Sequence, residues 1–203
     1  MKVKFNIIFC FLAIAAAFVP SCNSTYAAET IGYGDNIVMA GPGFQYPLRG
    51  DFRDYHGNKF DFNVQYYRYF GNCFAAGIRA GYIIPDKGDI QLKYSNISFS
   101  PLLRYYPSFA DHVVYCIGGV GFNFRKLEAD VAYESVPDAG SLRISDFGPS
   151  LIIGAGAEIR LTGTIIVGLE TTLDYIYDKE TDRGAFGNTG GLNILLNFGY
   201  LFH

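Results

Sequence analysis

The sequence predicts an all-β fold, an eight-stranded antiparallel up-and-down transmembrane β-barrel. The first observation is that apolar and polar residues alternate with a period of two over eight segments, none of which has a helical period. The second is a composition of 50% hydrophobic but only 17% charged residues, with 24 Gly, 16 Tyr and 18 Phe. The third is that long and short connections between the segments alternate strictly, as they do in up-and-down barrels.

The amino terminus is expected to be a signal peptide, residues 1–27, that is cleaved. Basic residues precede an apolar core over residues 5–19, and the small pair Ala27-Ala28 suits a cleavage site. The core is about 15 residues long, too short for a membrane-spanning helix of about 20 residues. Residues 28–203 then form the barrel domain. An alternative is a lipoprotein signal in which Cys22 is acylated.

Each predicted strand has about the 9 to 11 residues that a tilted strand needs to cross a membrane. The strands are 35–46, 59–70, 73–83, 95–106, 112–124, 148–161, 165–177 and 190–202. The connections at 71–72, 107–111 and 162–164 are short and contain turn residues, whereas those at 47–58, 84–94, 125–147 and 178–189 are long. In the first strand, Pro42 lacks an N–H for the ladder, so we expect a bulge or a bend there.

One face of each strand is apolar and is expected to face lipid. On the second to seventh strands this face comprises Phe60, Phe62, Val64, Tyr66, Phe74, Ala76, Ile78, Ala80, Tyr82, Ile97, Phe99, Leu103, Tyr105, Val120, Phe122, Phe124, Leu151, Ile153, Ala155, Ala157, Ile159, Leu161, Ile165, Val167, Leu169, Leu173, Tyr175 and Tyr177. No charge interrupts it, although Arg or Lys at the middle of a membrane would cost about 2 to 4 kcal/mol. Tyrosines at strand ends suit the membrane boundary.

The opposite face is polar and is expected to line the lumen. Its charged members, the candidate site residues, are Asp61, Arg79, Arg104, Glu158, Arg160, Glu170 and Asp174. An eight-stranded barrel has room only for its own side chains or one small ligand, so these charges should pair across the interior. We expect Arg79 to meet Glu170 in mid-lumen, and Arg104, Glu158 and Arg160 to gather closer to the short turns. The two cysteines of the barrel, Cys73 and Cys116, point to opposite faces and are expected to be isolated thiols.

The last strand alternates most clearly, with Leu192, Ile194, Leu196, Phe198, Tyr200 and Phe202 on one face. It resembles the terminal strand of bacterial outer-membrane β-barrels, although His203 follows the final aromatic residue. The Gly- and aromatic-rich segments 75–82 and 115–124 strengthen the resemblance, which is to the small barrels that include the membrane domain of outer-membrane protein A and the protein X and protein W types.

That resemblance implies a monomer in the outer membrane of a Gram-negative bacterium. Its partners would be outer-membrane lipid, lipopolysaccharide and the barrel-assembly machinery, for which Phe198, Tyr200 and Phe202 would form the assembly signal. No nucleic-acid partner is expected, since the net charge is −3 and no basic stripe is present. No cofactor or metal is expected, because the acidic residues 178, 180 and 182 lack the glycine and distal glutamate of a calcium loop.

Three functions are compatible with such a barrel. The first is a structural or small-solute porin-like role with a charge-paired lumen and no enzyme activity. The second is a surface interaction or adhesion module, since segments 131–133 and 142–144 alternate and suggest a hairpin that protrudes beyond the membrane. The third, a lipid-modifying enzyme, has least support: His56 is the one histidine in a predicted outer loop, and the serine and histidine that lipid A deacylases carry before the last strand are absent.

Overall fold

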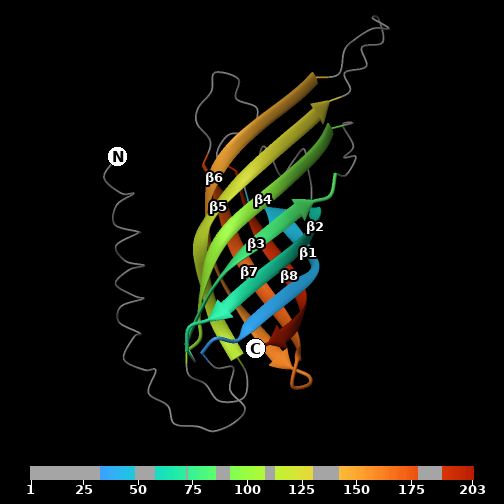
Figure 1. The fold of residues 1–203 in the computed structure, drawn as a ribbon. Coiled ribbons are helices and arrows are strands. Elements are labelled where there is room, and N and C mark those ends of the chain that lie inside the picture. The colour runs from blue at the N-terminus through green and yellow to red at the C-terminus, as the bar shows by residue number, and fades with distance from the viewer. Residues whose placement is uncertain are drawn as a thin grey trace, which may run out of the picture.

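The computed structural model describes residues 33–48, 58–71, 73–85, 92–107, 113–129, 142–177 and 189–203. These residues form one closed barrel in which every strand is antiparallel to its chain neighbours and β1 pairs with β8 (Figure 1). The strands are β1 (Asn36–Pro47), β2 (Lys59–Tyr69), β3 (Phe74–Ile83), β4 (Leu92–Tyr105), β5 (Val113–Ala129), β6 (Leu142–Arg160), β7 (Ile165–Ile176) and β8 (Thr189–Phe202). The predicted fold class is confirmed.

The barrel has two unlike ends. We call the end with the short connections, the start of β1 and the end of β8 the turn end, and the opposite end the loop end. At the turn end, Gly71 has a φ of 116°, a left-handed conformation that favours glycine in the connection from β2 to β3. There, His203 Nδ1 also lies 2.5 Å from Asp35 Oδ1 and joins the two closing strands. The predicted signal peptide lies outside the described residues.

Strands β4, β5 and β6 reach further at the loop end than predicted (Figure 1). The pairing of β5 with β6 runs without interruption from Val113 opposite Glu158 to Ala129 opposite Leu142. From the sequence, we expect these strands to end with their lipid-facing apolar residues. The sheet continues beyond that point because the inward-facing side chains of Leu127 and Ile144 pack against a buried pair, Ile83 and Tyr94. The predicted segment 142–144 is therefore strand, whereas 131–133 lies outside the described residues.

The outward face is an apolar band. Side chains predicted to meet lipid are exposed on it, including Phe124 at 55%, Leu169 at 55% and Phe198 at 54%.

The inward face forms the core, and it differs from the prediction of a mostly polar lumen. Toward the turn end, a cluster of buried aromatic and aliphatic side chains fills the interior, comprising Ile37, Met39, Tyr67, Tyr69, Ala75, Leu102, Tyr106, Tyr115, Ile117, Ile152, Ile166 and Leu201. Period-two alternation identifies the inward face but does not require it to be polar.

Two local predictions can be compared with the pairing of the strands and the state of the thiols. No bulge forms at Pro42, because the pairing of β1 keeps the same register with β2 and β8 on both sides of it. The strands instead approach closely beside it, since a Cβ on Gly41 would lie 1.7 Å from the carbonyl oxygen of Leu196. Cys116 is a free thiol, as predicted, so no bridge joins it to Cys73. The described residues contain no helix that could cross a membrane.

Candidate functional site

Four charged side chains from four strands meet in the lumen. Arg79 comes from β3, Arg104 from β4, Glu158 from β6 and Glu170 from β7. Each occupies an inward position of its strand, because successive side chains of a strand point to opposite faces. All four are at most 5% exposed. Charges buried to this extent are stable only when they are paired and hydrogen-bonded.

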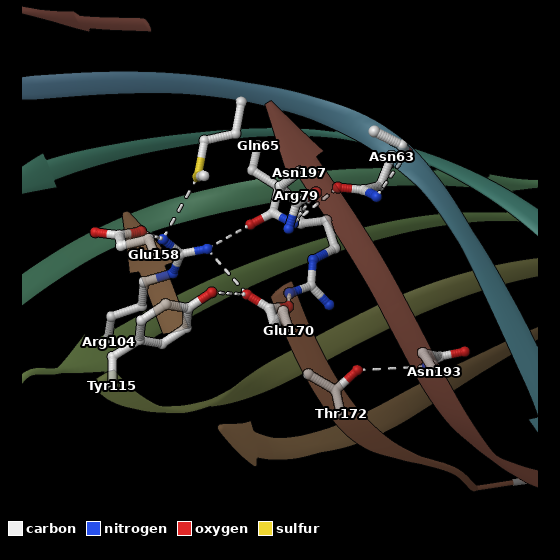
Figure 2. A network of polar contacts seen from close by, with 12 residues as sticks. Asn63, Gln65, Arg79, Arg104, Tyr115, Glu158, Glu170, Thr172, Asn193 and Asn197 are labelled. Atoms are coloured by element: carbon white, nitrogen blue, oxygen red, sulfur yellow. Dashed lines mark hydrogen bonds and ion pairs between the residues drawn. The ribbon is translucent and has the colours of Figure 1, made fainter. Parts of the chain in front are cut away.

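Arg104 lies at the centre of this charge network and bridges both carboxylates (Figure 2). Its Nη1 donates to Glu158 Oε2 at 3.1 Å, and its Nη2 donates to Glu170 Oε2 at 2.9 Å. The other carboxylate oxygen of Glu170 forms an ion pair with Arg79. Gln65 Oε1 accepts a further hydrogen bond from Arg104 Nη2 at 2.9 Å. Two cations therefore balance two carboxylates, and the network has no net charge.

Two tyrosine rings hold the Arg104 guanidinium between them. Its central carbon lies 3.8 Å from the ring centroid of Tyr67 and 4.2 Å from that of Tyr115, within range of cation–π attraction. Tyr115 also donates a hydrogen bond to Glu170 Oε2 at 2.9 Å. Stacking and hydrogen bonding together fix the orientation of the guanidinium plane.

Glycines opposite these tyrosines make this arrangement possible. Gly156 pairs with Tyr115 across β5 and β6 and with Glu170 across β6 and β7. A Cβ on Gly156 would lie 2.4 Å from the Tyr115 ring, so the ring can cross to Glu170 only over a glycine. Gly77 plays the same part beneath Tyr67, where a Cβ would lie 2.5 Å from the ring. Aromatic rings commonly cover glycines of a neighbouring strand in this way.

A second tyrosine pair closes the lumen on the turn-end side of the network. Tyr69 donates a hydrogen bond to Glu158 Oε1 at 3.0 Å, and its hydroxyl oxygen lies 3.1 Å from that of Tyr106. Ile37, Ile166 and Leu201 are buried in the same cluster. Charged, aromatic and aliphatic side chains therefore obstruct the lumen in successive layers.

On the loop-end side, the lumen contains a polar pocket. Its lining comprises Gln45, Asp61, Arg79, Gly81, Ile83, Asn96, Ser98, Ser100, Asn123, Ile152, Asp174, Asn193 and Leu195. Asp61 and Asp174 thus lie beside Arg79 but are not in its ion pair with Glu170. Nearer the loop end, Arg125 forms an ion pair with Asp146.

The remaining predicted residues lie at the turn end. Arg160 is half-buried at the end of β6, one inward position beyond Glu158. Phe198, Tyr200 and Phe202 lie on the outward face of β8, where the last two rings stack with centroids 6.4 Å apart. Sequence reasoning did not single out Tyr115, Tyr69 or Tyr106 for the site. Counting inward positions along each strand would have detected Tyr115, which shares a face with Asn123.

The carboxylate oxygens of this network are all occupied by partners within it. Each carboxylate oxygen of Glu158 and Glu170 accepts at least one hydrogen bond or ion pair from the groups described above. Among the described residues, no group of three or more His, Cys, Asp or Glu side chains is placed to hold a metal ion. The network can therefore link β3, β4, β6 and β7 across the interior and obstruct the lumen.

Comparison with solved structures identifies the architecture. The closed antiparallel barrel of eight strands is similar to the solved structures of several bacterial outer-membrane proteins. The chain has the fold of the small outer-membrane β-barrels. The chain superposes on Neisserial surface protein A with a TM-score of 0.57 and 10% sequence identity. The superposition covers 83% of this chain and 99% of Neisserial surface protein A.

Two further structures show the same fold. A major outer-membrane protein of Thermus thermophilus has a TM-score of 0.57 at 15% identity, covering 82% of this chain and 99% of its own. Ail, the attachment invasion locus protein of Yersinia pestis, has a TM-score of 0.54 at 14% identity, covering 84% and 99%. No protein-family model and no curated protein matches the sequence.

Proposed function

We propose that this protein is an integral outer-membrane barrel with a closed lumen and a structural role in the cell envelope. The observation that carries the proposal is Arg104, which is completely buried between two carboxylates and two tyrosine rings in the lumen. The apolar outer band supports a membrane location, because its large exposed side chains are stable in lipid and not in water. The proposal includes no enzyme activity.

Export and assembly complete this proposal. Residues 1–27 would direct export and be removed, and the aromatic residues of β8 would present the assembly signal to the barrel-assembly machinery. Support for the second point comes from Phe198, Tyr200 and Phe202, whose side chains all lie on the outward face of a strand that pairs with both β1 and β7. The barrel is closed by its own first and last strands, which suits a monomer.

Single-channel conductance tests the closed lumen. We expect no steady openings from the mature chain refolded into planar bilayers, and none from the Arg79→Ala variant. Removing Arg79 enlarges the polar pocket, but Arg104, its tyrosines and the aliphatic cluster still obstruct the lumen below it. A known porin in the same bilayers is the positive control, and heat-modifiable mobility on a gel verifies folding. Steady openings of the wild type that grow in Arg79→Ala would instead establish a pore gated by the charges.

A surface-interaction role is the second candidate, and the extended β5–β6 hairpin favours it. Both strands continue beyond the apolar band to Ala129 and Leu142. In the part of the chain that the structure describes, only β5 pairs with residues 142–148 of β6, and an added strand would pair with this edge. Ail, named for attachment and invasion, shares the fold.

Shortening the hairpin tests this second candidate. Residues 125–146 are replaced by Asn-Gly, which joins the paired residues Phe124 and Phe147 through a two-residue turn and removes the extension. We expect the variant to fold, since Phe124 and Phe147 stand at the end of the apolar band and the strands within that band are kept. If the hairpin is an interaction surface, bacteria that display the variant attach to an epithelial cell layer severalfold less than bacteria that display the wild type. Equal attachment, with equal display, would rule the hairpin out.

A further inference from the structure

The outward face of β4, β5 and β6 changes abruptly from apolar to basic at the loop end. The last apolar outward residues are Ile97, Phe124 and Phe147, which pair with one another across the three strands. They are 51 to 57% exposed, and the rings of Phe124 and Phe147 lie 5.0 Å apart. Such an aromatic row marks the boundary between hydrocarbon and lipid headgroups.

Two rows of polar residues follow directly beyond this boundary. The first consists of Ser95, Lys126 and Ser145, and the second of Lys93, Glu128 and Arg143, with each row paired strand to strand. Because neighbouring strands are about 4.8 Å apart and successive outward residues about 7 Å apart, the six side chains cover an area comparable to one lipid headgroup. We call these six residues the basic patch.

Charge distinguishes the basic patch from the rest of the molecule. Within it, three cations face one carboxylate, although the whole chain has a net charge of −3. Glu128 binds two of the cations side by side, with Lys126 Nζ at 2.7 Å and Arg143 Nη2 at 2.8 Å from the same oxygen. Lys126 and Arg143 remain 43% and 65% exposed, so their other donors are available to a ligand. The excess positive charge predicts an anionic ligand.

We propose that the basic patch binds a phosphate group on a lipid of the outer leaflet, as in the lipid A part of lipopolysaccharide. Phosphate fits because it accepts several hydrogen bonds, and Arg143, Lys126 and the flanking serine hydroxyls supply donors at the right spacing. A membrane-borne phosphate is favoured over a soluble one because the patch adjoins the aromatic row without a gap. A bound lipid would place its acyl chains on that row while its phosphate meets the cations. This inference rests on the proposed outer-membrane location.

Native mass spectrometry of the mature chain, refolded in detergent micelles that contain bisphosphorylated lipid A, tests the proposal. The variant is Lys126→Gln/Arg143→Gln. Its matched control is Arg68→Gln, which removes an exposed, outward-facing cation of β2 at the turn end. We expect the wild type and Arg68→Gln to carry lipid A equally, and the double variant to bind it about tenfold more weakly, given the size of single surface charge–phosphate attractions.

Two further arms identify the chemical source of the binding. Lipid A without phosphates should bind the wild type as weakly as bisphosphorylated lipid A binds the double variant. Excess inorganic phosphate should leave the complex intact. The proposal is overturned if the double variant binds like the wild type, if dephosphorylated lipid A binds equally well, or if inorganic phosphate displaces the lipid. Heat-modifiable mobility on a gel distinguishes failure of the proposed function from failure of the lipid-binding proposal. A wild type that does not fold in micelles contradicts the proposed function. A wild type that folds but carries no lipid A contradicts only the binding of lipid A by the basic patch.

Discussion

Replacing Arg104 by leucine is expected to lower the free energy of unfolding by about 3 to 5 kcal/mol, the usual cost of leaving a buried charge unpaired. Glu158 would lose the ion pair that Arg104 provides, and Glu170 would keep its ion pair with Arg79 but lose the one with Arg104. Tyr67 and Tyr115 would also lose the cation between their rings. The measurement is the urea midpoint of the heat-modifiable band after equilibration in lipid vesicles.

Two comparison variants show whether the loss comes from the network. Arg68→Gln removes an exposed cation and should change stability by less than about 0.5 kcal/mol. Arg104→Leu/Glu158→Gln removes the stranded carboxylate together with the cation, so it should regain part of the loss, because an uncharged glutamine costs less to bury. If Arg104→Leu is no less stable than Arg68→Gln, the network does not support the barrel.

A charge placed on the outer band should be costly as well. Leu169 is 55% exposed on β7 and pairs with Ala157 and Leu196, in the middle of the apolar face. In lipid, Leu169→Arg is expected to cost about 2 to 4 kcal/mol, because the guanidinium must leave water or deform the bilayer around it. The same refolding titration in vesicles measures this cost.

Gly163→Arg is the matched control for this substitution. Gly163 lies in the connection between β6 and β7, and a Cβ there would meet open space. The added arginine remains in water, so we expect a change below about 0.5 kcal/mol. Equal stabilities of the Leu169→Arg and Gly163→Arg proteins would mean that the outer band is not in contact with hydrocarbon, which would contradict a membrane location.

Several features of the site followed from local pattern. Alternation assigns Arg79, Arg104, Glu158 and Glu170 to one face, and the cost of burying charge requires partners for them. Alternation cannot specify the level of each residue along the axis, because that depends on strand tilt and register. Arg104 was therefore expected near Glu158 but not against Glu170, which its long side chain reaches from another side of the barrel.

The local sequence pattern also could not predict where β4, β5 and β6 end at the loop end of the barrel. Lipid-facing residues stop at Phe124 and Phe147, and the alternation at 131–133 and 142–144 predicts a protruding hairpin without fixing where its strands run. The strands continue because Leu127 and Ile144 find a surface of Tyr94 and Ile83 to pack on, a contact between strands that are distant along the chain. The basic patch depends on the same pairing, since Lys93, Lys126 and Arg143 become neighbours only when the three strands align.

Sequence alone determined the number of strands, their two faces and the order of long and short connections, because period-two alternation and turn residues are properties of neighbouring positions. Only the tertiary structure decided that the turn-end half of the lumen is aromatic and aliphatic, and that two tyrosines hold Arg104 over Gly77 and Gly156. Those contacts join strands across the barrel, and their geometry arises only when closure sets every register at once.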